Sequence, residues 1–265
     1  MSSPVEQLGP RRMPVLFAGH GSPMNAIEDN TWSRALVALG TNLPEPKAIV
    51  CISAHWFVGG TFVTANPMPR TIHDFGGFPQ ELFEVQYPAR GDVDLAKRIT
   101  SLLAERRAEE RTDWGLDHGT WSVVKHLRPK ADVPVLQVSI HRSLPGSAHV
   151  AIGRALAPLR DEGVLVIGSG NITHNLRDAF SNRGRETPQW ATNFDADITR
   201  ALEQRDEAFL VRALDTEIGQ RSHPTPDHYL PLLYAYGATS DADAVTSPIT
   251  GFDWSSLSMR SVRFG

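Results

Sequence analysis

Short apolar runs alternate along the chain with longer segments in which apolar residues recur every three or four positions. Apolar runs of about four to eight residues between turn residues are typical of buried strands, and the longer spacing is typical of helices. Apolar and polar residues alternate over 256–264, which predicts a last strand at an edge of the sheet. Buried strands are predicted at 14–18 (PVLFA), 48–53 (AIVCIS), 133–140 (VPVLQVSI) and 164–168 (VLVIG).

The segments between these runs carry the signals of helices. Asn30 or Thr31 can cap a helix that runs to about residue 39. Asp92 can cap a second helix, whose apolar residues share one face. Further helices are predicted after Leu116–Trp121, over 147–160 and around Trp190, Phe194 and Ile198.

One more helix start is predicted near the C-terminus. Thr225-Pro226-Asp227 offers a capping hydroxyl, a proline suited to the first helical position and an acid. His228 would then lie in the first turn of this helix. Pro231 should bend or restart the helix, because proline lacks the amide that the helix needs.

The alternation of strands and helices predicts an α/β fold. We expect a single domain with a mostly parallel central sheet flanked by helices on both faces. The chain has 265 residues and shows no internal repeat, linker or low-complexity stretch. Residues 1–12 are polar and contain two prolines, so a flexible N-terminal tail is expected there, with the folded domain over 13–265.

Composition and charge exclude some classes of partner. Hydrophobic residues make up 41% and charged residues 21%, as in an ordinary globular protein. The formal net charge is −4. The densest basic stretch, Arg106-Arg107 with Arg111, is interrupted by glutamates, which indicates a solvated helix face. No nucleic acid partner is therefore expected.

Neither a signal peptide nor a membrane span is predicted. Residues 1–12 lack the apolar run of a signal peptide, and no stretch approaches about 18 continuous apolar residues. The single cysteine, Cys51, lies in a predicted buried strand and excludes an intramolecular disulfide. We therefore expect a cytoplasmic protein with no membrane partner.

Histidines lie where the predicted elements meet. His20, His55 and His174 each come shortly after a predicted buried strand, and His118 and His228 lie at predicted helix starts. Ligands of open α/β sheets bind at the carboxyl ends of the strands. We therefore expect these side chains to converge on one edge of the sheet.

Several histidines at one edge indicate a transition-metal site, because imidazole suits zinc, iron, copper and nickel. A structural zinc site would more often use cysteines, and a catalytic metal needs open positions beside about three protein ligands. Histidines in excess of those ligands could transfer protons. One histidine after a strand is more often a structural residue, so the prediction depends on their joint placement.

The other histidines receive other interpretations. His73 lies in the Gly- and Pro-rich stretch 66–91 and is a lid or surface-loop residue, because loops this long are usually functional. His223 is a candidate neighbour of the site. Structural or exposed positions are predicted for His126, His141 and His149.

Short segments around the five candidate histidines resemble a known family, the class III extradiol ring-cleavage dioxygenases, in the branch that includes the 4,5-DOPA dioxygenases. The similarity runs in the family's order from residue 13 to the C-terminus, which makes 13–265 the expected catalytic domain. The segments are GHGSP (19–23), SAHW (53–56), LDHGTW (116–121), NITHN (171–175) and PTPDHY (224–229), with 71–79, 258–260 and 263–265 also similar.

The resemblance implies a non-haem Fe(II) enzyme that cleaves a DOPA-like catechol next to its two hydroxyls, using O2, to a muconic semialdehyde. By position, His20, His55 and His228 match the metal ligands, and His118 and His174 match the acid/base histidines. The implied partners are the small-molecule catechol and O2.

The third ligand departs from the wider class, in which many members use two histidines and a carboxylate. Here the matching position is His228. A neutral third ligand makes the site less anionic, so Zn(II) is a second candidate occupant. Trp56, Phe75 and Phe78 are expected as walls for a flat aromatic substrate.

Two other functions fit the same histidines. One is a zinc-dependent hydrolase of amides or esters that uses metal-bound water. The other is a non-catalytic binding protein that keeps a metal for its structure. Activity with zinc without O2 would favour the first, and unfolding on metal removal without catechol turnover would favour the second.

Overall fold

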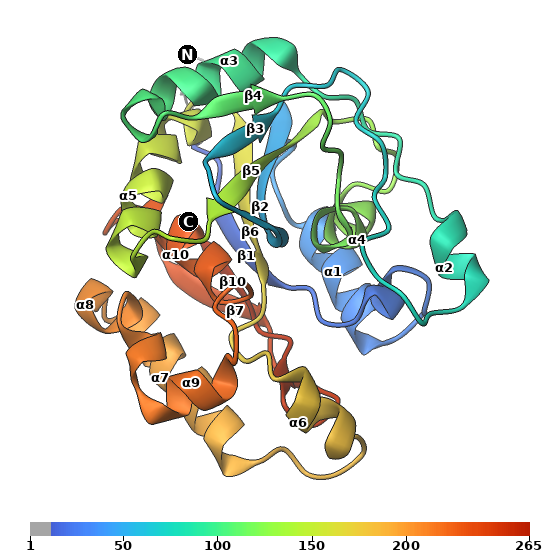
Figure 1. The fold of residues 1–265 in the computed structure, drawn as a ribbon, viewed down its shortest axis with the longest axis vertical. Coiled ribbons are helices and arrows are strands. Elements are labelled where there is room, and N and C mark those ends of the chain that lie inside the picture. Colours follow the sequence, from blue (N-terminus) through green and yellow to red (C-terminus); the bar gives the residue numbers. More distant parts are fainter. Residues whose placement is uncertain (1–11) are drawn as a thin grey trace, which may run out of the picture.

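The computed structural model describes residues 12–265, so the expected tail over 1–12 lies outside the described residues except for Arg12. Within this part of the chain, eight strands form one mixed sheet in the order β4-β3-β5-β2-β6-β1-β10-β7, and β8 pairs with β9 separately (Figure 1). The strands are β1 (Val15–Gly19), β2 (Ala48–Val58), β3 (Phe62–Thr64), β4 (Glu109–Arg111), β5 (Val135–His141), β6 (Val164–Gly170), β7 (Val245–Ile249), β8 (Phe252–Asp253), β9 (Leu257–Ser258) and β10 (Ser261–Phe264).

The strands at the centre of the sheet run parallel. β2 pairs with β5 and β6, and β6 pairs with β1, each in parallel register. β10 and β7 extend the sheet beyond β1 in antiparallel register. The predicted α/β fold with a mostly parallel sheet is therefore confirmed, and the carboxyl ends of the four central strands lie at one edge.

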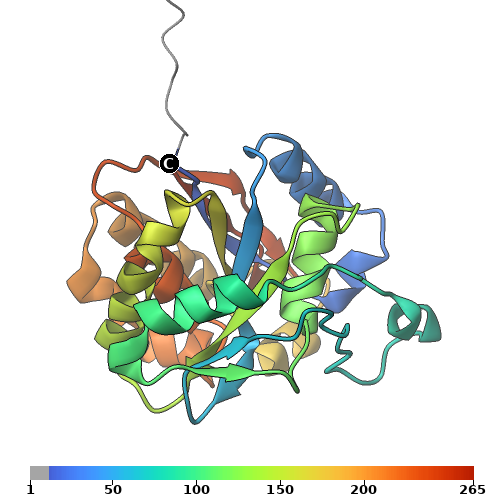
Figure 2. The ribbon, with the colours of Figure 1, turned by 90° about the horizontal axis from the view of Figure 1, so that it is seen from above.

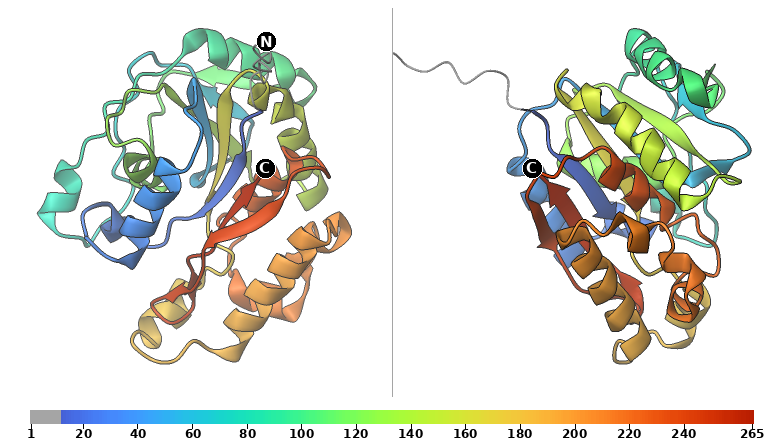
Figure 3. Two further views of the ribbon diagram at one scale, coloured as in Figure 1. Left: turned by 180° about the vertical axis from the view of Figure 1, so that it is seen from behind. Right: turned by 90° about the vertical axis from the view of Figure 1, so that its left-hand side faces the viewer.

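Helices cover both faces of this sheet. In Figure 1, α5 and α10 lie on one side and α1 and α4 on the other, and Figures 2 and 3 show the same layers from other directions. No helix in residues 12–265 combines the length and apolar character needed to cross a membrane. The helices are α1 (Thr31–Thr41), α2 (Gln80–Glu84), α3 (Val93–Leu102), α4 (His118–Leu127), α5 (Gly146–Leu156), α6 (Leu176–Ser181), α7 (Gln189–Glu203), α8 (Glu207–Leu210), α9 (Glu217–Ser222) and α10 (Leu230–Gly237), with 3₁₀ helices at Pro23–Ala26, Ala104–Arg106, Ala157–Arg160 and Ala213–Asp215.

Alternate residues of the strands point into two separate cores. Val15 and Phe17 of β1 belong to the core that includes residues of α5 and α10. Leu16 and Ala18 belong to the core that includes residues of α1 and α4. Full burial of a Val, Leu or Phe side chain contributes about 1.5–3 kcal/mol. Burial on both faces therefore holds the central strands, and the loops at their carboxyl ends, firmly in place.

The predicted helix starts at Asn30 and Asp92 are confirmed. The Asn30 side chain accepts hydrogen bonds from the backbone N–H groups of Trp32 and Ser33, and the Asp92 side chain accepts one from Leu95. Such caps satisfy amides that have no partner within the helix and are worth about 1 kcal/mol each.

The range 256–264 does contain strand, as predicted, but the predicted position at an edge of the sheet is wrong. Its main part is β10, which lies between β1 and β7, so β7 forms that edge. β7 escaped prediction because its sequence, VTSPI, is half exposed and contains Pro248. Proline cannot donate to a neighbouring strand, and it is tolerated at an edge.

The predicted helix start at Thr225 is also wrong. α10 begins at Leu230, with Pro231 in its first turn, where a missing amide costs little. Residues 224–229 form turns, and the N–H groups of Tyr229 and Leu230 both donate to the Pro226 carbonyl. His228 therefore lies in a turn just before the helix.

Candidate metal centre

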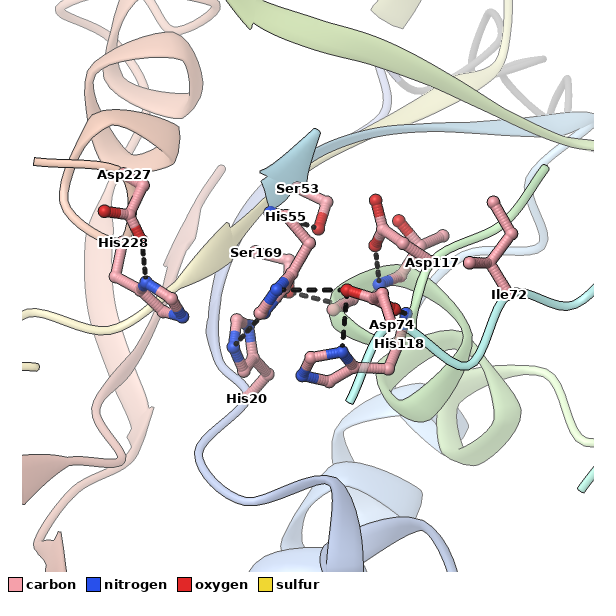
Figure 4. Close-up of polar contacts among 12 residues, drawn as sticks. His20, Ser53, His55, Ile72, Asp74, Asp117, His118, Ser169, Asp227 and His228 are labelled. Atoms are coloured by element: carbon pink, nitrogen blue, oxygen red, sulfur yellow. Dashed lines mark hydrogen bonds and ion pairs between the residues drawn. The ribbon is translucent and has the colours of Figure 1, made fainter. Parts of the chain in front are cut away.

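The five candidate histidines all reach one region beyond the carboxyl ends of the central strands. His20 directly follows β1, His174 follows β6 after three residues, and His118 is the first residue of α4. Figure 4 shows His20, His55, His118 and His228 turned toward a common centre. The expected convergence of these side chains is what the structure shows.

His55 does not follow its strand, as the sequence suggested, but lies within β2. The pairing of β2 with β5 loses its regular register between Ile52 and Phe57. Such irregularities re-aim side chains and are common beside active sites. This one accounts for a histidine that points into a site from inside a strand.

Close backbone contacts connect the loops that carry His20 and His228. The N–H of His20 donates to the carbonyl of Gly170 at 3.0 Å, and the carbonyl of His228 accepts from Asn171 N–H at 2.9 Å. A Cβ atom at Gly170 would lie 2.1 Å from the His228 carbonyl oxygen. Glycine at the end of β6 therefore allows His228 to approach the sheet.

His20, His55 and His228 form a compact set of possible metal ligands. One ring nitrogen from each lies within 4.8 Å of the others. The Nε2 atoms of His20 and His55 are 3.4 Å apart, and the ring centroids of His55 and His228 are 5.0 Å apart. This spacing suits three nitrogen donors around one ion.

The opposite nitrogen of each of these rings has a partner of its own. His55 Nδ1 lies 3.2 Å from an Asp74 carboxylate oxygen, and His228 Nδ1 donates to Asp227. His20 Nδ1 lies 2.9 Å from the Ser169 hydroxyl. That hydroxyl donates its only hydrogen to the Gly119 carbonyl, so toward His20 it must accept.

These partners fix the tautomer of each ring. The carboxylates can only accept a hydrogen bond, and so can the Ser169 hydroxyl, because its hydrogen is already donated to Gly119. The ring proton is therefore on Nδ1, and the lone pair of Nε2 faces the centre. Metal-binding histidines are commonly oriented by such contacts. The residues present therefore fit a transition metal with open positions.

Burial keeps two of the three rings neutral. Burial, with the neighbouring histidines, places the pKa values of His20 and His228 well below the usual range. Burial also lowers the pKa of His55, but the hydrogen bond to Asp74 and nearby carboxylates outweigh it and raise that pKa. Neutral imidazole is the form that binds metals.

Asp74 is a candidate functional residue that the sequence reasoning missed. Its Oδ2 lies 3.0 Å from His118 Nδ1 as well as near His55, and its Oδ1 accepts from the His118 backbone N–H at 2.9 Å. Burial opposes ionisation of Asp74, but its hydrogen bonds with His118 and His55 lower its pKa overall. Its position within the family-like segment 71–79 was the available signal.

His174 contacts the other site histidines by stacking on His228. Its ring lies parallel to that of His228, with centroids 3.4 Å apart and an interplanar angle of 3°. The backbone N–H of His174 donates to the Ser222 carbonyl at 2.9 Å. Burial lowers the pKa of His174 to about 3, so its ring is neutral near pH 7.

The histidines form the floor of a cavity of about 290 Å³. Phe75 and Phe78 line it, as predicted, but Trp56 does not. Trp56 is 3% exposed and stacks on Trp114 instead. Further apolar walls, which the sequence reasoning did not identify, come from Leu176, Phe180, Trp254 and Leu257.

Other histidines bond elsewhere. His126 Nε2 lies 2.8 Å from the Asn25 carbonyl, and His223 Nε2 lies 2.7 Å from the Ile172 carbonyl. His149 is buried, with Nδ1 3.1 Å from the Tyr234 hydroxyl. Structural roles fit the predictions for His126 and His149, and none of these three lines the cavity.

Comparisons with known proteins give the family of the chain. Residues 21–264 match the model of the catalytic LigB subunit of aromatic ring-opening dioxygenase. A 4,5-DOPA dioxygenase extradiol of Escherichia coli is 48% identical over 96% of this chain and 95% of its own length. A protein of the same name from Beta vulgaris is 36% identical over 94% of this chain and 96% of its own length.

A solved structure has the same fold. It is the crystal structure of an uncharacterized protein from Escherichia coli K12, with 43% identity and a TM-score of 0.84 over 96% of this chain and 100% of that one. A ring-opening dioxygenase family implies a non-haem metal, for which the histidine cluster offers a ligand set. The chain belongs to the LigB family and is an extradiol aromatic ring-opening dioxygenase of the same type as the 4,5-DOPA dioxygenases that it resembles.

Proposed function

We propose that His20, His55 and His228 hold Fe(II), and that the enzyme uses O2 to cleave a DOPA-like catechol to a muconic semialdehyde. The supporting observation is the convergence of three ring nitrogens within 4.8 Å on the floor of a cavity with aromatic walls. The names of the relatives support a DOPA-like substrate.

When bound, the metal supplies positions for the catechol oxygens and for O2, together with the redox chemistry that activates oxygen. Neutral imidazoles suit Zn(II) as well as Fe(II). We propose Fe(II) as the active metal, since ring opening with O2 needs a redox-active ion.

His118 is placed to accept a proton from a catechol hydroxyl. Its Nδ1 faces the Asp74 carboxylate, which can only accept, so in the neutral ring the proton is on Nδ1. The other nitrogen, Nε2, then carries a lone pair on a ring that lines the cavity. Proton acceptance at Nε2 would leave a cation that Asp74 stabilises.

His174 is the second proton-transfer residue in this proposal. It lines the cavity from the side of His228 and is neutral near pH 7, so it can take up a proton from the substrate and return it in a later step. Its stacking on His228 fixes the orientation of the ring. Of the two proposed proton-transfer histidines, His118 therefore lies beside His55 and His174 beside His228.

The cavity walls orient the ring of the substrate. Phe75 packs edge-on against His118, with centroids 5.3 Å apart, and against Phe78 at 5.4 Å. These faces match the flat, apolar part of a catechol and exclude water from the reacting atoms. The zinc hydrolase alternative would use the same histidines, and membership in a dioxygenase family favours ring cleavage.

The test is anaerobic reconstitution with Fe(II), followed by measurement of oxygen uptake on addition of DOPA. We expect oxygen uptake with a new yellow, semialdehyde-like absorbance. The zinc-loaded protein should take up no oxygen and serves as the control. No uptake with any of several catechols, with iron confirmed in the protein, would contradict the proposal.

A further inference from the structure

The cavity above the histidines has no permanently charged side chain in its described lining. Among the described residues that line it there is no arginine, lysine, aspartate or glutamate. A buried charge without a partner is strongly unfavourable. A catechol with a charged side chain would therefore find oppositely charged side chains only beyond the described residues that line this cavity.

Two hollows adjoin the cavity, and their charges differ. One shares Ser22 and Trp254 with the cavity and has a volume of about 650 Å³. The other shares His174 and Leu176 with the cavity and has a volume of about 430 Å³. Its lining among the described residues includes the cation of Arg177 but no carboxylate. The larger hollow carries both signs of charge, from Arg183, Arg185, Glu28 and Asp253.

Arg183 lies directly beside the shared wall. Its guanidinium is 4.8 Å from the centroid of the Trp254 ring, and Trp254 packs against Phe180 at 5.0 Å. Within residues 12–265, Arg183 makes no ion pair. Its planar fork of N–H groups is therefore available for a carboxylate.

Asp253 provides the opposite charge next to the same tryptophan. Its carboxylate accepts a hydrogen bond from the backbone N–H of Trp254 at 2.9 Å. Burial raises the pKa of Asp253. The charge of Glu28 raises this pKa further and the charge of Arg183 lowers it, so both side chains lie close enough to Asp253 to affect its ionisation.

The backbone of this wall is in an unusual conformation. Trp254 and Ser255 have φ angles of 44° and 66°, in the left-handed region that residues other than glycine seldom adopt. The Ser255 hydroxyl is buried without a hydrogen-bond partner. Strained residues of this kind cluster at sites that bind ligands.

We infer that the hollow lined by Arg183 and Asp253 is a subsite for the side chain of a catechol amino acid, with Arg183 binding its carboxylate and Asp253 its ammonium group. This inference rests on the proposed function, because it requires the catechol ring to lie above the histidines. The presence of both charges favours a zwitterionic side chain over a simple acid.

The experiment compares kcat/KM for DOPA and for 4-methylcatechol, which has no charged side chain, in the Fe(II) enzyme. Arg183→Ala should lower the preference for DOPA about two- to fivefold, mainly through KM, since Arg183 is exposed and ion pairs of exposed side chains are weak. Arg183→Lys should lose less, because it keeps the charge but not the fork. Arg177→Ala, at an exposed arginine of α6, is the matched control and should keep the wild-type preference.

Asp253→Asn tests the other half of the subsite and can retain the hydrogen bond with Trp254. It should lower the preference for DOPA over 3-(3,4-dihydroxyphenyl)propionate, which lacks the ammonium group. A circular dichroism melt of each variant shows whether it is folded. If Arg183→Ala does not fold, Arg183→Lys and Asp253→Asn provide the measurement.

An unchanged preference in the folded Arg183 variants, or a loss in Arg177→Ala, would overturn this assignment. A wild-type enzyme with equal kcat/KM for DOPA and 4-methylcatechol would overturn it too. A wild-type enzyme that turns over neither catechol would instead contradict the proposed function, so the two failures are distinct.

Discussion

Asp74 links a proposed metal ligand to a proposed proton acceptor through one carboxylate. Its Oδ2 lies 3.2 Å from His55 Nδ1 and 3.0 Å from His118 Nδ1. Both histidines therefore depend on the same charge for their tautomer. Asp227 has a simpler role, because it contacts His228 alone among the site histidines.

Replacing Asp74 should affect metal binding and turnover together. Asp74→Asn can offer an amide N–H where the rings need an acceptor, so we expect metal affinity to fall about 10- to 100-fold and kcat to fall as well. A chelator competition titration measures the affinity, and oxygen uptake measures kcat. Asp227→Asn is the comparison and should weaken metal binding with less effect on kcat at full metal loading. Equal effects of the two variants on kcat would contradict the shared role of Asp74.

Mutations should also distinguish the proposed metal ligands from the proposed proton-transfer residues. His55→Ala should lose both metal and activity. His174→Ala should keep the metal and lose about 10²- to 10⁴-fold in kcat, the usual contribution of a general acid or base. Metal content by elemental analysis, alongside oxygen uptake, distinguishes these outcomes, and a fully active His174→Ala would refute its role.

At the scale of elements, the first turn of α4 lies tightly against β2. A Cβ atom at Gly119 would lie 2.4 Å from Ser53 Oγ and 2.8 Å from His55 Cδ2. Asp117, which is fully buried, caps this helix through the Thr120 N–H. The helix thus holds His118 while leaving just enough room for His55.

Gly119→Ala should therefore displace His55. We expect weaker metal binding and reduced activity in a protein that still folds, because the clash involves a side chain that can move. Gly59→Ala is a suitable control, since its Cβ would meet nothing closer than 3.7 Å. Metal affinity in Gly119→Ala equal to that of the control would show that β2 tolerates the added methyl group.

The sequence was sufficient to predict elements with a strong hydrophobic pattern. It was also sufficient to predict site residues that lie in recognisable local motifs. The central strands are continuous apolar runs because both faces are buried, so they could be predicted. β4 could not, because its sequence, EER, is polar and mostly exposed. The contact of Asp74 with His118, 44 residues away, depends on tertiary folding and has no local signature.

At the scale of the molecule, Arg160 joins distant parts of the chain. Its side chain, 1% exposed, donates to the carbonyls of Met13 and Ala238 and to the carboxylate of Asp243. These partners lie before β1, after α10 and before β7. The C-terminal segment that carries β7 is thereby attached to the centre of the fold.

Removing the carboxylate should destabilise the protein. Asp243→Asn leaves the Arg160 cation without its counter-ion, a change that typically costs about 3–5 kcal/mol when both groups are buried, and less here because Asp243 is partly exposed. Urea denaturation at pH 7 measures this loss, and Asp241→Asn, at an exposed neighbour, is the control. A variant as stable as wild type would refute the role of the pair.

This stabilisation should depend on pH. Burial raises the pKa of Asp243, but its hydrogen bonds with Arg160 and Ser240 outweigh burial, so the folded-state pKa is lowered. The contribution is then present above the unfolded-state pKa of about 3.9 and is lost as the pH falls through the lower folded-state value. The difference in unfolding free energy between wild type and Asp243→Asn should shrink below about pH 4. A constant difference down to pH 2 would contradict this linkage.

The Nδ1 contacts of the three proposed ligand histidines have a consequence for which metal the site holds. Because Ser169, Asp74 and Asp227 belong to the protein itself, the orientation of these rings does not depend on which ion binds. Iron and zinc should then compete for the same three nitrogen donors, and the more abundant ion should occupy the site. Growth in iron-poor, zinc-rich medium would therefore give folded but inactive enzyme, and replacement of zinc by iron would restore its activity.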